Sequence, residues 1–466
     1  MMRIDNIAEY RVLFTITVLL MFLCSCEDLV EADAPKTELV SKTVFEDDRT
    51  ATAVLTGIYA RMMASSGFAS GFANSISVLG GLSADELVSY GFSDDFFENT
   101  LQSTDQTVRL FCWNEPYQYI YTANVVLEGL LETTAITPVV KRQLEGEARF
   151  IRAFCYFYLV NFFGDVPLHL TSDYRENSVR SRMPAAEVYQ QIVADLKEAQ
   201  KLLPADYAFS EGERIRPNQW AATALLARTY LYMEDWENAE IQATRVIDNP
   251  LYELPENLNE VFLKNSREAI WQLMPVQPGI NTWEGFRFIL VSAPPSTQGL
   301  SESMVHAFEA GDERQNKWVG SITKDGDTWY YPHKYKIRLG TVLSEYSMVL
   351  RVAEQYLIRA EARAQQNKIE GAVKDVDALR KRANLDLIAD TDPGIGKSGL
   401  LEAILRERRV ELFTEWSHRW LDLKRSENSD TVLGAVKPHW ETTDIFYPIP
   451  LDEILRNSSI TQNPGY

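Results

Sequence analysis

The chain has 466 residues, a formal net charge of −20, and a composition that is 45 % hydrophobic and 11 % aromatic. This is enough to bury a large core, in one large domain or in two interlocked ones. Because so negative a surface repels phosphate backbones, nucleic acid is not an expected partner.

The chain begins with a short apolar run behind two arginines. Residues 12–23, VLFTITVLLMFL, carry no charge and follow Arg3 and Arg11. Spanning a bilayer takes roughly 20 apolar residues, so this run is too short, but it is typical of the central region of a signal peptide. The alternative is a buried N-terminal helix, which is disfavoured because no polar residue alternates with the apolar ones.

Two cysteines follow that run, in the sequence LCSC at 23–26. The small residues Cys24 and Ser25 precede Cys26, which resembles a bacterial lipobox, where the cysteine is lipidated and becomes the new N-terminus. A metal or redox pair would need further ligands, and none lie nearby in the sequence. We therefore expect a lipoprotein signal peptide over 1–25 and a lipid anchor on Cys26.

The residues after Cys26 are acidic: Glu27, Asp28, Glu31 and Asp33. Such a run resembles the signal that Bacteroidota use to place lipoproteins on the outer leaflet of the outer membrane. The alternative is an acidic linker that only solvates the tether. We expect residues 26–45 to form a lipidated, acidic tether, with the protein anchored in the outer membrane and facing the cell exterior.

Most of the remaining chain shows the 3.6-residue period of amphipathic helices. Apolar residues recur with this period between Ala148 and Phe162, and Gly164 ends that segment. Strand-like runs are few and short: AIWQLMP, TWYYPHKY after an Asp325-Gly326 turn, and IFYPIP. Cys112 and Cys155 lie in aromatic helical contexts and are expected to be core thiols. Further helices are predicted at about 49–64, 113–132, 185–203, 218–232, 237–248, 350–366, 370–383 and 399–416.

Two of these helix pairs repeat each other. At an offset of 133 residues, Ala227 matches Ala360 and Ala239 matches Ala372. Small residues at these positions let two antiparallel helices approach closely, which is the tetratricopeptide pattern. Units so far apart are not expected to form a tandem stack, so the insertions between them are expected to carry the ligand surface.

The motifs of several catalytic sites are missing from the sequence. Thr391 stands where a phosphate-binding loop ending in Gly396-Lys397-Ser398 would need glycine. The five histidines form no HExxH pair, and there is no GxSxG elbow. Neighbouring carboxylates such as Asp94 and Asp95 say nothing about the cross-cleft geometry of a glycosidase. We expect no catalytic residues, no cofactor and no metal site.

Five sequence blocks, in order, resemble the SusD/RagB family of outer-membrane nutrient-binding lipoproteins. The first is an arginine-rich aromatic helix with Arg149 and Arg152, which runs into Phe-Gly-Asp-Val-Pro-Leu at 163–168. One departure is Trp416, where the family usually has glycine, and it predicts a different local turn. The other four blocks are AATALLARTYLYMEDWENA, LRVAEQYLIRAEARA, LRERRVELFTEWSHRWLDLKR and YPIPLDEILRNSSITQNPGY.

The resemblance implies a mostly α, SusD-like fold with tetratricopeptide-type helix pairs, loop-rich insertions and a few short strands. It also implies a surface protein that binds an oligosaccharide and acts as the lid of a SusC-like TonB-dependent transporter. A RagB-like peptide-binding protein of the same architecture is the first alternative, and a surface glycosidase is the second.

The expected layout is a single domain over 46–466. Its helix scaffold covers about 140–250 and 349–383, and its C-terminal block covers 399–466. Loop-rich insertions cover about 65–112 and 251–348.

The charged side chains of the C-terminal block are expected to pair as scaffold, and Arg351 is expected to pair with Glu354. The C-terminal residues concerned are Glu407, Arg408, Arg409, Glu411, Arg419, Asp422 and Arg425.

Both insertions contain the side chains that a sugar site needs. Aromatic faces stack on pyranose rings, and polar side chains bind the hydroxyls. Trp283 is the leading stacking candidate; the alternative is that these aromatics pack on the scaffold, as Phe96, Trp113 and Trp271 are expected to do. The candidates are Asn281, Trp283, Phe286 and Arg287 in one insertion and Tyr90, Phe92, Asp94 and Asn99 in the other.

Overall fold

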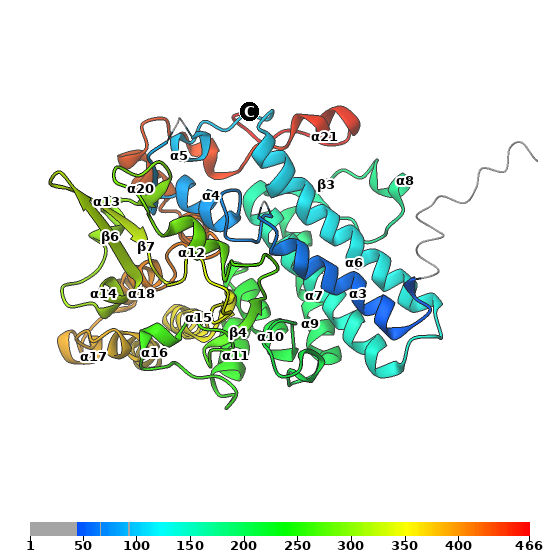
Figure 1. The fold of residues 1–466 in the computed structure, drawn as a ribbon, viewed down its shortest axis with the longest axis horizontal. Helices are drawn as coiled ribbons and strands as arrows, with labels where there is room; N and C mark the ends of the chain where they lie inside the picture. Colours follow the sequence, from blue (N-terminus) through cyan, green and yellow to red (C-terminus); the bar gives the residue numbers. More distant parts are fainter. Residues whose placement is uncertain (1–43, 66, 92–93) are drawn as a thin grey trace, which may run out of the picture.

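The computed structural model describes residues 44–65, 67–91 and 94–466 (Figure 1). The signal peptide, Cys26, most of the tether and Phe92 lie outside the described residues. Long helices dominate the body, and strands occur only in short pairs, so the predicted mostly α class is confirmed. Among the described residues, no helix has the length and apolar character needed to cross a membrane.

The helices form one continuous array in which each packs against the next. The predicted helices are confirmed, except that α18 ends at Glu411 and not near residue 416. The helix α3 (Asp48–Met62) lies across α6 and α7 at one end of the array. The array comprises α6 (Glu115–Glu132), α7 (Pro138–Phe163), α9 (Ala185–Leu202), α10 (Gln219–Tyr232), α11 (Trp236–Ile247), α15 (Val352–Gln365), α16 (Ile369–Arg382) and α18 (Lys397–Glu411).

The repeated helix pairs are α10–α11 and α15–α16. Ala227, Ala239, Ala360 and Ala372 are all fully buried, as close helix packing requires. The expectation that the two units do not stack is wrong, because α11 packs directly against α15. The chain leaves the array after α11, builds the long insertion, and returns at α15 beside the point where it left.

Among the residues that the structure describes, four two-stranded antiparallel sheets tie the loops together. They pair β1 (Leu87–Ser89) with β5 (Gln298–Leu300), β2 (Val166–Pro167) with β3 (Arg182–Met183), β4 (Ala269–Leu273) with β8 (Ser347–Arg351), and β6 (Val319–Lys324) with β7 (Asp327–Pro332). The predicted strand AIWQLMP contains β4, and TWYYPHKY contains β7 except for its first residue, Asp327. The β4–β8 pair closes the base of the long insertion.

Two of the local strand predictions have opposite outcomes. Asp325 and Gly326 form the two-residue hairpin turn between β6 and β7, with φ values of 56° and 97°. IFYPIP forms no strand: its Tyr447 amide donates to the Phe162 carbonyl at 2.8 Å, and its two prolines have no amide hydrogen to extend a ladder.

Short helices connect these parts. They are α4 (Ile76–Ser83), α5 (Asp95–Glu98), a π-helix (Val108–Asn114) that runs into α6, α8 (Tyr174–Asn177), α12 (Trp283–Phe288), α13 (Glu302–Val305), α14 (Glu313–Trp318), α17 (Ile388–Thr391), α19 (His418–Arg425), α20 (Ser429–Val436) and α21 (Leu451–Arg456), with 3-10 turns at Ala208–Ser210, Leu258–Glu260 and Thr442–Ile445. Cys112 and Cys155 are free and buried, so their prediction as core thiols is confirmed.

A buried ionic network holds the C-terminal block to the array. Arg351 reaches Glu415 at 2.8 Å, Glu411 at 2.6 Å and Glu268 at 2.7 Å. The predicted Arg351–Glu354 pair is wrong, because Arg351 is still extended at φ −142° and does not share a helix face with Glu354. Glu354 pairs instead with Arg228 at 2.6 Å.

The other charged side chains of the C-terminal block also pair. Arg408 and Arg425 both bind Asp422, at 2.7 and 2.8 Å. Arg409 and Arg419 both bind Asp85, each at 2.7 Å. Glu407 accepts from Arg314 at 2.5 Å. These ion pairs agree with the prediction that the charged side chains of this block pair as part of the scaffold.

Trp416 adopts a backbone conformation that favours glycine, with φ 47°. Its indole nitrogen donates to the Met348 carbonyl at 2.7 Å, and its ring is buried against Phe154 at 5.4 Å. The family's usual glycine at this place suits the positive φ. In this chain a buried indole fills the space that glycine would leave empty.

Candidate ligand-binding site

The two insertions lie side by side. β1 belongs to the first insertion and β5 to the second, and the two strands pair with Leu87 opposite Leu300. The Tyr90 amide continues this ladder by donating to the Thr297 carbonyl at 3.1 Å. Segments that the sequence separates by about two hundred residues therefore form one surface.

A small cleft of about 150 Å³ opens between these segments. We call it the insertion cleft. Phe72 of the first insertion lines it, together with Phe286, Arg287 and Arg338 of the second and the loop 289–297.

The floor of the insertion cleft is a cluster of three aromatic rings. Phe72 lies 4.9 Å from Trp283 and 6.0 Å from Phe286, and Trp283 packs edge-on to Phe286 at 5.5 Å. Trp283 is only 8 % exposed, and its indole nitrogen donates to the Met63 carbonyl at 2.8 Å. Trp283 therefore supports the cleft from below and offers no open face on which a sugar can stack. The partly buried ring of Phe286, not Trp283, lines the cleft.

Two arginines line the cleft above these rings. The Arg338 guanidinium carbon lies 4.5 Å from the centre of Phe286, and that of Arg287 lies 5.7 Å from the centre of Phe72. Stacking of this kind orients a guanidinium and leaves its edge for hydrogen bonds. Arg287 donates to the Gln298 side chain. Burial lowers the pKa of Arg287, and the nearby Asp94 opposes this.

Three other predicted residues have mainly structural roles. Asn281 is fully buried and fastens the loop 340–345: its amide donates to the Gly340 and Val342 carbonyls, and its oxygen accepts from the Ser344 and Glu345 amides. Asp94 caps α5 by accepting from the Phe96 and Phe97 amides. Asn99 ends α5 in a left-handed conformation and is buried beside a cavity of only about 10 Å³.

Of the eight predicted residues, the cleft thus brings together Phe286 and Arg287. Tyr90 is 37 % exposed beside the β1–β5 pair, and Phe92 lies outside the described residues. Sequence reasoning missed Phe72 and Arg338. Phe72 lies in a Gly- and Ser-rich stretch of the first insertion, GFASGFANS, and composition of that kind was the only signal available for it.

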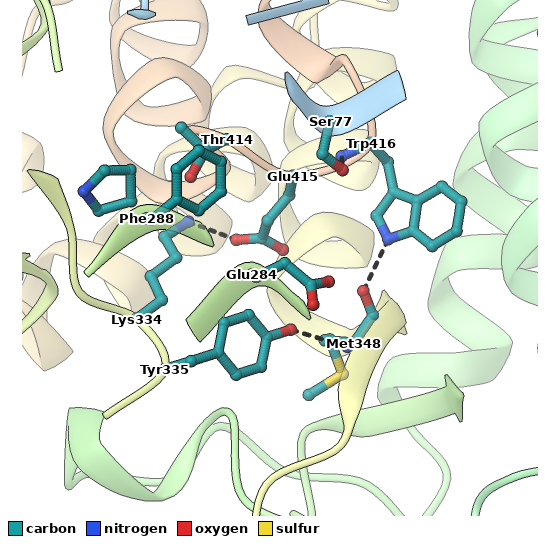
Figure 2. A pocket seen from close by; sticks show the side chains of 10 residues that line it. Ser77, Glu284, Phe288, Lys334, Tyr335, Met348, Thr414, Glu415 and Trp416 are labelled. Carbon is teal, nitrogen blue, oxygen red and sulfur yellow. Dashed lines mark hydrogen bonds and ion pairs between the residues drawn. The ribbon is translucent and has the colours of Figure 1, made fainter. Parts of the chain in front are cut away.

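The helix α12, which carries Trp283 and Phe286, is anchored from beneath by buried charges (Figure 2). The Glu284 carboxylate accepts a hydrogen bond from Ser347, and burial raises the pKa of Glu284 to about 7. Lys334 pairs with Glu415 nearby, and burial lowers the pKa of Lys334 to about 8. The cavity among these groups is about 10 Å³, room for about one water molecule and for no organic ligand.

No cluster of potential metal ligands occurs in the part of the chain that the structure describes. Lys334 and Glu415 pair with each other beneath α12, and Ser347 holds one oxygen of Glu284, whose other oxygen has no partner among the described residues. The insertion cleft places aromatic surface beside two guanidinium groups, the combination of apolar lining and a few polar groups that ligand pockets have.

The fold and this loop-built site define a class of helical-repeat binding proteins, and comparisons identify the family. Residues 54–231 match a family model described as "Starch-binding associating with outer membrane", and residues 306–466 match the model described as "SusD family". The chain belongs to the SusD/RagB family.

Among the relatives is SusD-like protein P2 of Formosa agariphila, 27 % identical over 98 % of this chain and 100 % of that protein. The starch-binding protein SusD of Bacteroides thetaiotaomicron is 23 % identical over 72 % of this chain and 75 % of its own length.

Solved structures confirm the SusD-like fold. A SusD superfamily protein from Bacteroides vulgatus superposes with a TM-score of 0.79 at 21 % identity, covering 91 % of this chain and 100 % of that one. A laminarin-binding SusD-like protein superposes with a TM-score of 0.73 at 24 % identity, covering 90 % and 100 %.

Proposed function

We propose that this protein is a cell-surface lipoprotein that binds an oligosaccharide in the insertion cleft and passes it to a SusC-like TonB-dependent transporter. The observation that carries the proposal is the convergence of two distant insertions on a cleft built from phenylalanine and arginine. The names of two similar proteins, one starch-binding and one laminarin-binding, support a glycan as the ligand.

The geometry suits the end of a sugar chain. A cleft of about 150 Å³ is small beside typical pockets for organic ligands, which hold roughly 300–1,000 Å³. One terminal ring would enter it, and the rest of the chain would run over the open surface beside it. The pyranose ring would pack against the part of the Phe286 ring that Arg338 leaves uncovered, and the edge of Arg338 would donate to neighbouring hydroxyls. The Nε of Arg338 is buried and donates to no described residue, so the terminal guanidinium nitrogens would be the donors to a ligand.

The anchor and the transporter partnership rest on the sequence. The LCSC motif with Cys26 predicts three acyl chains at the mature N-terminus, and more than one chain is what firm anchoring requires. Mass spectrometry of the mature protein tests this: a lipidated N-terminal Cys26 supports surface anchoring, whereas an unmodified Cys26 or a retained Cys24 contradicts it. Co-purification of the TonB-dependent transporter from native outer membranes tests the partnership.

The binding test uses isothermal titration calorimetry with the purified protein. The ligands are uncharged hexasaccharides of glucose with α-1,4, β-1,3 or β-1,4 linkages, acidic oligosaccharides, and a mixed tetrapeptide library. Phe286→Ala and Arg338→Ala should each lower the affinity for the bound glycan about tenfold, the equivalent of about 1.4 kcal/mol. Val342→Ala is the matched control, since Val342 is 76 % exposed in the same insertion and does not line the cleft.

Three results would count against the proposal. Unchanged glycan affinity in both cleft variants would move the site elsewhere. Binding of peptides, with no response to any glycan, would favour the peptide-binding alternative. Turnover of a glycan that stops on replacement of one carboxylate would establish a glycosidase.

A further inference from the structure

A second and larger cavity lies away from the insertions. It has a volume of about 440 Å³, against about 150 Å³ for the insertion cleft. Its walls are the π-helix and the first half of α6, the segment 167–178 that follows β2 and includes α8, and the C-terminal helix α21. In Figure 1 α6, α8 and α21 lie toward the right of the molecule, and the β6–β7 hairpin lies at its left edge. We call this cavity the α6 groove.

One wall of the α6 groove is a ladder of aromatic rings. Trp113, Tyr117 and Tyr121 are four residues apart, so they lie along one face of the continuous helix. The Trp113 ring is 2 % exposed and lies 5.1 Å from the Tyr117 ring, so it packs on the scaffold as expected and supports Tyr117 from the core side. Tyr121 is 44 % exposed, and on α8 Tyr174 is 76 % exposed. Two large aromatic side chains therefore reach solvent within a single concave site.

The floor of the groove is held in place by buried hydrogen bonds. The Tyr117 hydroxyl donates to the Pro167 carbonyl at 2.8 Å, and the Tyr117 ring packs against His169 at 5.1 Å. Asn124 donates to the His169 and Thr171 carbonyls, both at 3.1 Å. Arg152 donates in turn to the Asn124 oxygen at 2.8 Å. A site held this way does not have to order itself when a ligand binds.

The charges that line the groove are neutral or paired. Burial and the nearby Arg180 lower the pKa of His169 to about 4, so its imidazole is uncharged at neutral pH. Glu453 pairs with Arg456 at 3.4 Å. The groove therefore presents no unpaired charge that would select an ionic ligand.

The remaining polar lining consists of amides and hydroxyls. Asn114, Gln118, Asn177, Ser178 and Asn457 all face the cavity. The carboxamide oxygen of Asn177 is buried and accepts no hydrogen bond from any described residue. Its amide donates to the Thr171 carbonyl at 2.8 Å, which fixes the direction in which that oxygen points. A buried acceptor without a partner costs about 1–3 kcal/mol.

We propose that the α6 groove is a second carbohydrate site, which binds an uncharged oligosaccharide along Tyr117 and Tyr121 on α6 and Tyr174 on α8. Successive aromatic rings match a chain of repeating pyranose units, and neutral amides match hydroxyl groups. The proposal takes its class of ligand from the proposed function, but its location is independent of the insertion cleft. A protein with two such sites holds a long glycan at two points, which raises its overall affinity through effective concentration.

The experiment is titration calorimetry of the purified full chain with the three uncharged glucose hexasaccharides, each measured separately. Tyr121→Ala, Tyr174→Ala, Phe286→Ala and the control Leu131→Ala are each compared with the wild type. Tyr121→Ala, Tyr174→Ala and Leu131→Ala are also each combined with Phe286→Ala. Tyr121 and Tyr174 are exposed, so their removal leaves the core intact. Leu131 is 82 % exposed on the same helix α6 and does not line the groove.

We expect binding of at least one hexasaccharide to persist in Phe286→Ala. Adding Tyr121→Ala or Tyr174→Ala to that variant should weaken the remaining binding about fivefold to tenfold, and Leu131→Ala should not. If Phe286→Ala removes all binding while both tyrosine variants bind like the wild type, the groove is not a glycan site and the proposed function stands. If only acidic oligosaccharides bind, and only through the insertion cleft, the inference is overturned in the same way.

Two further outcomes separate the claims. If Tyr121→Ala loses all glycan binding and Phe286→Ala binds like the wild type, the groove is supported. The cleft is then overturned as the site of the proposed function. If no glycan binds the wild type, both claims are overturned. A partner protein that binds the wild type and loses binding in Tyr174→Ala, with no glycan bound there, would make the groove a protein interface and overturn the inference.

Discussion

Replacing Trp416 by glycine tests how this chain departs from the usual pattern of its family. Trp416 has φ 47°, a conformation that glycine adopts without strain and that strains a bulky residue. Backbone preference alone therefore predicts that Trp416→Gly stabilises the protein. The side chain argues the opposite, since the indole is 3 % exposed, packs on Phe154 and Tyr158, and donates to the Met348 carbonyl at 2.7 Å.

The two effects differ in size. Releasing a left-handed conformation gains about 1–2 kcal/mol. Removing a buried tryptophan costs about 3–5 kcal/mol, and the unfilled hydrogen bond at Met348 adds about 1 kcal/mol. We expect Trp416→Gly to lower the free energy of unfolding by about 3 kcal/mol. Its amide keeps the hydrogen bond to the Ser77 hydroxyl, because any residue at 416 supplies that donor.

Equilibrium urea unfolding, followed by far-UV circular dichroism, measures this change. The matched control is Asn384→Gly, since Asn384 is exposed and has φ 59°. That substitution places glycine at another left-handed position without removing a buried ring. Because asparagine tolerates this conformation, the stability should stay within about 0.5 kcal/mol of the wild type or rise slightly. A Trp416→Gly protein as stable as the wild type would refute the claim that the indole outweighs the backbone strain.

Two further predictions concern buried groups. Burial raises the pKa of Glu284 from 4.5 to about 7, so the wild type loses stability as the pH rises from about 5 through 7 and this carboxyl ionises. Glu284→Gln removes the carboxyl, so the variant does not show this loss. The variant should be about 3 kcal/mol more stable than the wild type at pH 8 and nearly equal to it at pH 5, by urea unfolding at each pH; a difference independent of pH would contradict this. The thiols of Cys112 and Cys155 are buried, and burial raises the pKa of both, so neither should react with Ellman's reagent until the protein unfolds. Rapid labelling of the native protein would contradict that placement.

The helical scaffold could be predicted from the sequence because its signals are local. The alanines at 227, 239, 360 and 372 mark close helix contacts wherever the pairs lie in space. The stacking of α11 on α15 could not be predicted, because it depends on where the long insertion returns the chain. The same holds for Arg351, whose partners Glu268, Glu411 and Glu415 are 60 or more residues away.

The candidate site shows the same division. Composition selected the two insertions, and β1–β5 pairing brings them together. Composition could not show that Phe72 packs on Trp283. It also could not show that Asn281 forms its hydrogen bonds with the loop 340–345. Whether an aromatic ring is open to a ligand depends on its neighbours in space. The Trp113–Tyr117–Tyr121 spacing was visible in the sequence, whereas the opposing wall with Tyr174 was not.

The most direct test of the account is a crystal structure of the protein with the glycan that it binds most tightly in solution. The account predicts electron density for a sugar ring in the insertion cleft, lying on Phe286 and within hydrogen-bond distance of Arg338. A glycan bound only against the repeat helices α10, α11, α15 and α16, with the insertion cleft unoccupied, would contradict it.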